Sequence, residues 1–385
     1  MGVQLDISLD EMARRHARLK QAMAASGLKA LLVFGTANSN GNASIYAAGG
    51  FRYLSDFYTL TLYAVLVVSP DHPCSMFVPS ELCEDRGRRV SWVKDVRHSL
   101  DYASDVVRAC QERGVTDGKV GVVSLGSIPV PLYLELRERL PAVEFVDATQ
   151  TLLSIRHFKT KEERDLIAKS AWINDQAFQA LLHELRPGLR EFEVVNLLQT
   201  QQRALGADGI FNLISSGRFS AGTQGRPRLY HASSREIAAG DSLTLEVSCS
   251  YGGYWSQLVR VVSVGPADPD ALRIQEAAMT TLNKATGQLR AGARIDEYFG
   301  AMAEEAGRLG YKLITPTGHL CGMDLAEARI DNRTTIALEP DMAFICHPHL
   351  VDGTGRWLLW GHTFLMTENG PASVHADEET GFYAV

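Results

Sequence analysis

Residues 240–260, GDSLTLEVSCSYGGYWSQLVR, have the pattern of a β-hairpin around which the rest of the chain can be arranged. Small or polar residues alternate with larger apolar ones before a Tyr-Gly-Gly turn, and a second run follows over residues 254–264. This period of two around a glycine-containing turn predicts two paired strands with one buried face. Glu246 lies mid-strand among apolar neighbours, where its carboxylate either reaches water or must meet a cation.

The sequence on both sides of this hairpin predicts an α+β domain over residues 156–385. Thr160 and Glu163 have the spacing of a capping box at the start of a long helix, which the Pro-Gly pair at 187–188 ends. Further helical patterns occupy residues 191–205, 269–289 and 295–309. The last segment is rich in strand patterns. Helices followed by strands, without strict alternation, are typical of α+β folds.

The first 155 residues alternate short apolar runs with helical patterns. Residues 10–25 predict an amphipathic helix that ends at Gly27. Strand patterns follow at 30–34, 63–68, around Trp92, at 119–123 and at 143–148, and helical patterns lie at 103–113 and 131–140. Such alternation predicts an α/β domain over residues 1–155, a sheet covered by helices.

Composition narrows the class of protein. A chain of 385 residues exceeds one typical core, so two domains are expected. A formal net charge of −7 argues against a nucleic-acid or anionic-membrane surface, and no apolar run approaches the roughly 18 residues of a spanning helix. The charged N-terminal stretch does not resemble a signal peptide, and the six cysteines form no CxxC pair. We therefore expect a cytoplasmic protein with reduced cysteines.

Several polar residues occupy apolar strand or turn settings in the second domain. In chain order they are His231, Glu246, Gln257, His319 and His347, with His349 and His362 nearby. Imidazoles and a carboxylate that converge from separate strands are the components of a metal site or an acid-base site. A single histidine in an apolar strand is more often a hydrogen-bonded core residue, and spacing alone does not prove convergence.

Five motifs, in the same order, resemble the creatinase, aminopeptidase P and prolidase family, and together they span nearly the whole chain. They are FRYLSDF at 51–57, RHFKTKEERDLIAKSA at 156–171, GDSLTLE with GGYWSQLVR at 240–260, GHLCGMDLAE at 318–327 and LEPDMAF at 338–344. The resemblance implies a creatinase-type α/β N-terminal domain and a C-terminal domain with the α+β pita-bread fold.

The resemblance also implies a degenerate metal site. In the metal-dependent members, five side chains (Asp, Asp, His, Glu and Glu) hold two ions. The matching positions here are Glu246, Gln257, His319, His347 and Gly361. The two positions that would bridge both ions now hold a neutral amide and no side chain. Because two close divalent ions need bridging anions to screen their repulsion, we expect no normal dinuclear centre.

Two interpretations of this site stay open. In the first, the site is metal-free, as in the creatinase branch, which hydrolyses a C–N bond with a histidine as acid-base. That histidine matches His231, and an imidazole exchanges a proton near neutral pH. In the second, Glu246, His319 and His347 hold one iron, manganese or zinc ion in a lyase or oxidative enzyme. The first is preferred because Glu246 and His347 inherit positions that belong to different ions.

We accordingly expect a hydrolase of a small-molecule C–N bond, with His231 as acid/base and with His319, His347 and Glu246 completing the catalytic set. A catalytically silent binding protein is a further alternative. The second histidine of the family's GHGIGLDVHE motif matches Ala326, which weakens the assignment as a standard peptidase.

The substrate candidates follow from the same comparison. The two glutamates that grip the guanidinium of creatine match Val259 and Gly361, so creatine is a poor candidate. Trp255, Trp357 and Trp360 flank these positions, which indicates a less charged, ring-containing substrate unless the rings only fill the core. The residues expected to contact substrate are Arg52, Tyr254, Trp255, Gln257, Val259, His349, Trp360 and Gly361.

Arginines are the expected ligands of a substrate carboxylate, which their planar forks match. The candidates are Arg52, Arg226, Arg228, Arg329 and Arg333. Arg52 is favoured because members of this family usually form homodimers in which the partner's N-terminal domain covers the site.

Overall fold

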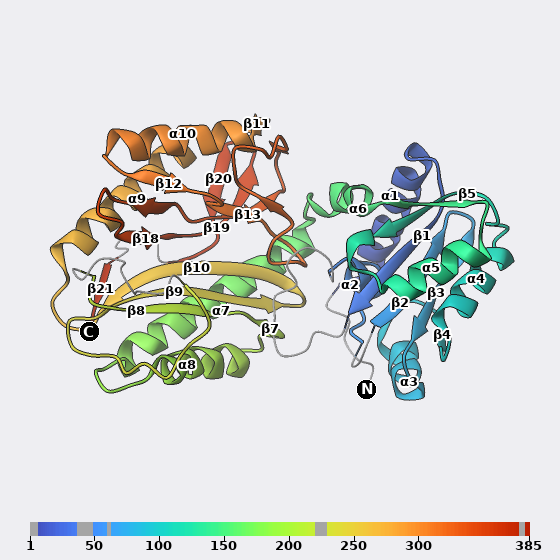
Figure 1. The fold of residues 1–385 in the computed structure, drawn as a ribbon, viewed down its shortest axis with the longest axis horizontal. Helices are drawn as coiled ribbons and strands as arrows, with labels where there is room; N and C mark the ends of the chain where they lie inside the picture. Colours follow the sequence, from blue (N-terminus) through green and yellow to red (C-terminus); the bar gives the residue numbers. More distant parts are fainter. Residues whose placement is uncertain (1–6, 37–48, 60–62, 220–228, 377–381) are drawn as a thin grey trace. The chain divides into compact units, whose positions relative to one another are not determined.

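The computed structural model describes residues 7–36, 49–59, 63–219, 229–376 and 382–385. The chain divides into two compact units after Arg156, one residue beyond the expected boundary. Each unit has its own sheet with helices packed on it (Figure 1). Among the described helices, none is long and apolar enough to cross a membrane.

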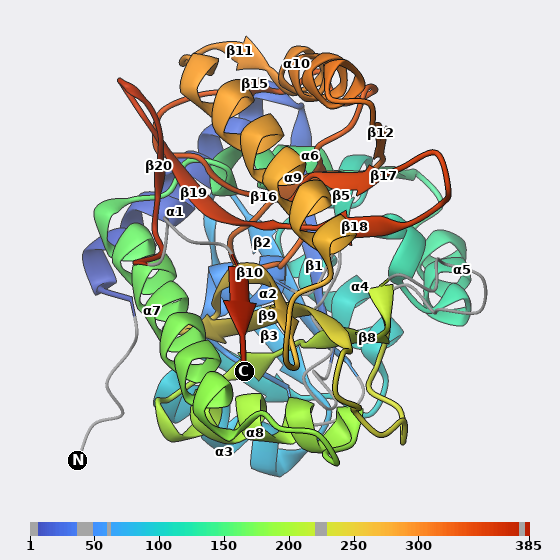
Figure 2. The same ribbon diagram turned by 90° about the vertical axis from the view of Figure 1, so that its left-hand side faces the viewer.

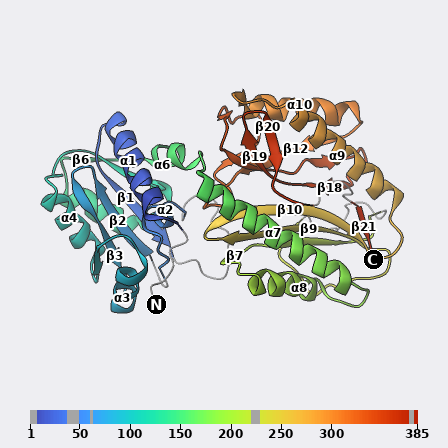
Figure 3. The same cartoon turned by 180° about the vertical axis from the view of Figure 1, so that it is seen from behind.

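Unit 1 is built on a six-stranded mixed sheet with the order β4-β3-β2-β1-β5-β6. The strands are β1 (Leu28–Thr36), β2 (Tyr63–Ser69), β3 (His72–Val78), β4 (Asp95–His98), β5 (Gly118–Val123) and β6 (Val143–Asp147). The helices are α1 (Leu9–Ala25), α2 (Gly49–Ser55), α3 (Glu81–Val90), α4 (Tyr102–Glu112), α5 (Val130–Arg139) and α6 (Thr149–Arg156). Helices α4 and α5 cover one face of the sheet, and α1, α2 and α6 cover the other (Figures 1 and 3).

Unit 2 is organised around a ten-stranded sheet. The strands are β7 (Gly209–Ile210), β8 (Leu213–Gly217), β9 (Ser242–Tyr251), β10 (Tyr254–Ser263), β13 (Gly318–Leu320), β14 (Ala328–Arg329), β16 (Ala343–Cys346), β19 (Gly361–Thr367), β20 (Gly370–Ser373) and β21 (Phe382–Ala384). The main path is β14-β13-β16-β19-β10-β9-β7; β20 pairs with β19, β21 with β10 and β8 with β9.

Four helices and two small sheets complete unit 2. The helices are α7 (Lys161–Glu184), α8 (Glu191–Ala204), α9 (Pro269–Gln288) and α10 (Ile295–Arg308). Helices α7 and α8 lie against one face of the β9–β10 region, and α9 and α10 lie on the other side (Figures 1 and 2). One small sheet has the order β12-β17-β18, from Lys312–Ile314, His349–Val351 and Trp357–Leu359, and the other pairs β11 (Ala293–Arg294) with β15 (Ala337–Leu338).

The predicted hairpin is β9 and β10, which pair antiparallel over their full length from Tyr251–Tyr254 to Ser242–Ser263. Gly252 and Gly253 have φ of 57° and 85°, the two positive values of the type I′ turn that suits a two-residue hairpin. The expectation of one buried face is wrong, because every residue of β10 is buried. Helix α7 packs on one face of the hairpin, and Trp357 and Leu359 of β18 pack against Val259 on the other.

Helix α7 begins as its sequence predicts. The Thr160 amide donates to the Glu163 carboxylate at 2.7 Å, and the Thr160 hydroxyl accepts from the Glu163 amide at 3.4 Å. The apolar residues of α7 then pack on the β9–β10 hairpin, where Phe178 and Leu181 join a core with Leu245 and Leu258. This packing fixes which face of the hairpin is left for a site.

Candidate active site

A row of residues crosses the sheet of unit 2 on the face turned away from α7. Residues that pair directly across antiparallel strands point to the same face. Ser248 pairs with Gln257, Thr363 with Ile345, and Ile345 with His319. The Thr363 hydroxyl joins the two halves, since it accepts from the Gln257 amide at 2.8 Å and donates to the Gln257 carbonyl at 3.1 Å. We call this face of the sheet the site face.

A second row lies beside the first on the site face. Leu213 pairs with Glu246, Glu246 with Val259, and Val259 with Gly361. His347 is the next residue of this row and lies beside Gly361, since a Cβ placed on Gly361 would be 2.6 Å from the His347 Cα. The register therefore brings Glu246, Gln257, Gly361, His319 and His347, which are distant in sequence, to one face.

Glu246 is the carboxylate of this face. Its side chain is partly exposed, yet its apolar surroundings raise the pKa of the carboxyl group to about 7, against the smaller opposing effect of a hydrogen bond from Gln257. Gln257 itself is 2% exposed, and its Oε1 has no hydrogen-bond partner in the part of the chain that is described. A carboxyl group with this pKa can hold or release a proton at neutral pH.

His319 and His347 form a close pair. Their ring centroids are 5.8 Å apart and the ring planes meet at 70°. Burial lowers the pKa of His319 to about 3, helped by the neighbouring His347, and burial lowers the pKa of His347 to about 4. Both Nδ1 atoms are buried and lack a partner among the described residues. Two neutral imidazoles thus present unsatisfied nitrogens, which suits the binding of a polar group or a water molecule.

His231 lies at an exposed place on the same side of the hairpin. A bridge between Ile214 and Tyr230 puts it next to Leu213, so that two strand spacings, about 10 Å, separate it from Glu246. Its ring meets Phe211 at 6.1 Å and Tyr230 at 5.3 Å. The structure thus places His231 apart from the His319–His347 pair.

The residues present do not fit the dinuclear metal centre that the family resemblance implies. No group of three or more His, Cys, Asp or Glu side chains within the described ranges is arranged to hold a metal ion. The single-ion set of Glu246, His319 and His347 is therefore not assembled. Along the sheet, β10 and β19 lie between Glu246 and His347, and β10, β19 and β16 lie between Glu246 and His319; Gln257 and Gly361 are on the intervening strands β10 and β19.

Some residues expected to contact substrate lie elsewhere. The Tyr254 hydroxyl donates to Glu163 of α7 at 2.6 Å, on the reverse face, because strand alternation turns it away from Gln257. Trp360 also lies on the reverse face, where the Arg260 guanidinium sits 4.9 Å from its ring centroid. Trp255 is on the site face by register, but its ring packs against Gly209 and is buried.

His349 and His362 also differ in placement. His349, on β17, packs edge-on against Trp357 at 5.3 Å. His362 pairs with Leu258 and so faces away from the site, 5.8 Å from the ring of His375. His375 is bound in turn by Asp175 of α7 at 2.6 Å. This buried cluster stabilises the reverse face, and no periodic pattern in the sequence predicts it.

The arginines expected to bind a substrate carboxylate lie in different parts of the structure. Arg329 pairs directly with His319 and is exposed, which places it at the edge of the site face. Arg333 is an exposed loop residue. Arg52 belongs to unit 1, where it lies 3.5 Å from Asp56 and 4.0 Å from the Tyr58 ring centroid. Arg226 and Arg228 lie outside the described residues.

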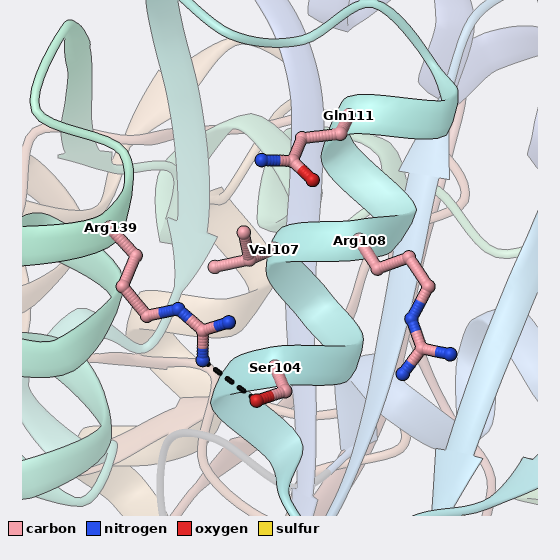
Figure 4. A pocket seen from close by; sticks show the side chains of 5 residues that line it. All are labelled: Ser104, Val107, Arg108, Gln111 and Arg139. Atoms are coloured by element: carbon pink, nitrogen blue, oxygen red, sulfur yellow. Dashed lines mark hydrogen bonds between the residues drawn. The ribbon is translucent and has the colours of Figure 1, made fainter.

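A further cavity, of about 530 Å³, opens between α4 and α5 of unit 1 (Figure 4). Ser104, Val107, Arg108, Gln111 and Arg139 line it. Arg139 donates to the Ser104 hydroxyl at 2.7 Å, and the side chains of Arg108 and Arg139 are 60% and 38% exposed. None of the predicted site residues lines it.

Comparison with known proteins decides the family. Residues 165–368 match the description of metallopeptidase family M24, and residues 15–158 match the creatinase/prolidase N-terminal domain. The chain belongs to metallopeptidase family M24. The predicted family and the predicted combination of an α/β N-terminal domain with a pita-bread C-terminal domain are confirmed.

Relatives within family M24 are distant in sequence and near in fold. An uncharacterized peptidase, YqhT, of Bacillus subtilis is 27% identical over 269 residues, 67% of this chain and 75% of that protein. The creatinase of a Bacillus species is 26% identical over 309 residues, 76% and 70% of the two chains. The Xaa-Pro dipeptidase structure from Bacillus anthracis superposes with a TM-score of 0.80 at 22% identity, covering 97% of this chain and all of that one. The dipeptidase PepE structure from Mycobacterium ulcerans superposes with a TM-score of 0.81 at 23% identity, covering 98% of this chain and 100% of that one.

Proposed function

We propose that this M24 member is a hydrolase that cleaves a C–N bond of a small molecule without a dinuclear metal centre. The observation that carries the proposal is the set of neutral or protonatable groups on the site face: the His319–His347 pair, Gln257 and the Glu246 carboxyl group. Relatives described as creatinase and as Xaa-Pro dipeptidase act on C–N bonds and support the reaction class.

The proton transfers of such a hydrolysis match these groups. Water adds to the carbon of the scissile bond, loses a proton to a base, and the proton is then given to the departing nitrogen as the C–N bond breaks. We assign the acid-base role to His231, which would meet the scissile bond beside Leu213, and we assign the binding of a more distant polar group of the substrate to the unsatisfied nitrogens of His319 and His347. Glu246, one row away, sets the charge of the site through its own protonation.

The substrate of this proposal carries a carboxylate. Arg329 supports this part, because it pairs with His319 at the edge of the site face and guanidinium groups bind carboxylates in a bidentate manner. Arg52 would contribute from a second subunit in the homodimer that the family resemblance implies. Light scattering on the purified protein tests that assembly, and we also propose a cytoplasmic location.

The test is a turnover screen on N-acylated amino acids and cyclic amides, with release of the free amine as the readout. We expect hydrolysis by the wild type and a loss of at least 100-fold in kcat for His231→Ala, since general acid–base catalysis contributes about 10²–10⁴-fold. His183→Ala, at an exposed position of α7, is the matched control and should keep full activity.

Three outcomes would contradict the proposal. Unchanged turnover in His231→Ala removes the acid-base role of that residue. Tight binding of ligands without turnover of any of them favours instead a catalytically silent small-molecule-binding protein. Turnover that depends on one added metal ion per chain would favour the single-ion lyase or oxidative enzyme.

A further inference from the structure

Lys159 forms a buried ion pair that none of the roles assigned above uses. Its Nζ lies 3.1 Å from Oε2 of Glu327, and the two side chains are 1% and 0% exposed. Gly322 closes over the pair, since a Cβ at that position would lie 2.6 Å from Glu327 Oε1 and 3.0 Å from Lys159 Cε. Because desolvation offsets much of the attraction, such a pair is a weak source of net stability, and its use can lie in fixing one conformation of the chain.

The segment that Glu327 closes begins beside one of the two site histidines. Residues 321–327 follow β13, which carries His319, and return to it, because the Glu327 amide donates to the Leu320 carbonyl at 2.8 Å. Burial lowers the pKa of the His319 ring, and a hydrogen bond to the Leu325 backbone opposes this effect more than one to Leu320 does. A hydrogen bond that raises the pKa of an imidazole is one that the ring donates to a carbonyl oxygen. Because Nδ1 of His319 has no partner among the described residues, the donor is Nε2.

This hydrogen bond decides which nitrogen of His319 carries the proton. The ring is neutral at pH 7.5, because burial lowers its pKa to about 3, and a neutral imidazole has a single N–H. A proton on Nε2 that is donated to the Leu325 carbonyl leaves a lone pair on Nδ1. If that carbonyl moved away, the two tautomers would lie closer in free energy. The placement of Leu325 therefore selects the tautomer.

Lys159 also holds the strand that leads to the second histidine. Its amide donates to the Asp341 carbonyl at 2.8 Å. Strand β16 starts two residues later and ends directly before His347. Lys159 thus contacts the segments that carry both site histidines, through its side chain towards His319 and through its backbone towards His347. A substitution of the side chain removes only the first of these two links.

We propose that Lys159 is a positioning residue, which fixes the orientation and the tautomer of His319 through Glu327 and the 321–327 segment. The inference rests on the proposed function in one respect, because His319 is taken there to bind a polar group of the substrate. Lys159 itself touches no substrate and acts only through this histidine.

Replacement of both members of the ion pair tests the proposal. Lys159→Met alone would leave a buried carboxylate without this cation, which can prevent folding. Lys159→Met/Glu327→Met removes both charges and keeps the interior filled, so this double variant should fold. Lys284→Met/Glu305→Met is the matched control, because it removes a lysine–glutamate pair that joins α9 to α10.

NMR of protein that carries isotope labels at its histidines reads the tautomer at pH 7.5, with the His319 signals assigned from His319→Gln. We expect the Nε2–H form in the wild type. In Lys159→Met/Glu327→Met, the ratio of the Nε2–H to the Nδ1–H form should fall about fivefold or more, which is the effect of losing one typical hydrogen bond. The control variant should leave the tautomer of His319 unchanged. An Nδ1–H form in the wild type, an unchanged ratio in the folded double variant, or an equal change in the control would overturn the proposal.

Turnover separates this inference from the proposed function. On a substrate that the wild type hydrolyses, Lys159→Met/Glu327→Met should raise KM about fivefold or more with little change in kcat, because the lost contribution is to binding. A changed tautomer in this variant, with no hydrolysis of any compound by the wild type, supports the positioning role and contradicts the hydrolase. Hydrolysis by the wild type, with an unchanged tautomer and an unchanged KM in the variant, supports the hydrolase and overturns the positioning role.

Discussion

The rings of His319 and His347 stand 5.8 Å apart and nearly perpendicular, one on β13 and the other just after β16. Neighbouring strands hold the two imidazoles in this arrangement through the pairing of His319 with Ile345. Burial keeps both rings neutral at physiological pH, since it lowers their pKa values to about 3 and about 4. The pair is therefore expected to make the protein sensitive to acid, besides the binding role proposed for it.

We expect the protein to lose stability as the pH falls from 6.5 towards 4. In the unfolded chain both histidines take up protons near pH 6.5, whereas in the folded chain they do so only near 3 and 4. The unfolded state then binds more protons, so its free energy falls relative to that of the folded state. Urea unfolding measures how much unfolding free energy the protein loses between pH 7.5 and pH 5. This loss should be smaller by about 1 to 3 kcal/mol in His347→Gln than in the wild type.

The control for that measurement is His183→Gln, which changes an exposed histidine of α7. It should retain the full pH dependence of the wild type. An identical loss of stability in His347→Gln and in the wild type would show that the buried pair does not resist protonation.

Glu246 is expected to give a pH dependence of opposite sign. The pKa of its carboxyl group is raised from 4.5 to about 7 in the folded chain, so its contribution to stability is present below pH 4.5 and is lost as the pH rises through 7. Glu246→Gln cannot ionise at this position. The difference in unfolding free energy between this variant and the wild type should therefore shift in favour of the variant by about 1 to 3 kcal/mol from pH 4 to pH 8. Equal differences in unfolding free energy at both pH values would contradict the raised pKa.

Gly361 should tolerate no side chain. A Cβ there would meet the Cys346 carbonyl oxygen at 2.0 Å and the His347 Cα at 2.6 Å, and both are backbone atoms that cannot move aside alone. Gly361→Ala is therefore expected to lower the unfolding free energy by about 3 kcal/mol or more, as severe overpacking does. Gly353→Ala is the control, because a Cβ at that position has nothing within 4 Å. Similar melting temperatures for the two variants would contradict this account.

Metal content is a separate prediction. Protein purified without chelators should contain well under one iron, manganese or zinc ion per chain by elemental analysis, because Gln257 and Gly361 supply no bridging anion. Chelator treatment should leave the melting temperature within about 1 °C, since no ion–ligand bonds stabilise the fold. One ion per chain, whose removal lowers the melting temperature, would instead support the ligand set of Glu246, His319 and His347.

Local features of the fold were predictable because their signals are short-range. The capping box at Thr160 and Glu163 and the turn at Gly252 and Gly253 both depend on residues a few positions apart. The family resemblance supplied the order of the domains, which no local pattern contains. The sequence could not show that residues on both faces of β10 are buried, because α7 on one face and β18 on the other come from distant parts of the chain.

The site was predictable in composition but not in every orientation. Tyr254 and Trp360 are neighbours of site residues in sequence, yet strand alternation turns both to the reverse face. Thr363 was missed, since its role is set by Gln257, which lies 106 residues away in the chain. Only the cross-strand register distinguishes such residues from their neighbours, and register is a property of the assembled sheet.

The close approach of backbone at Gly361 also bears on how this chain can change over time. A carboxylate at position 361 would require the 346–347 segment to shift as well, so a single substitution cannot place an acidic side chain there within the present sheet. Directed evolution of an acidic residue at this position would accordingly have to remodel two strands together. The backbone packing around Gly361 therefore limits which side chains, and so which chemistry, can evolve at this position.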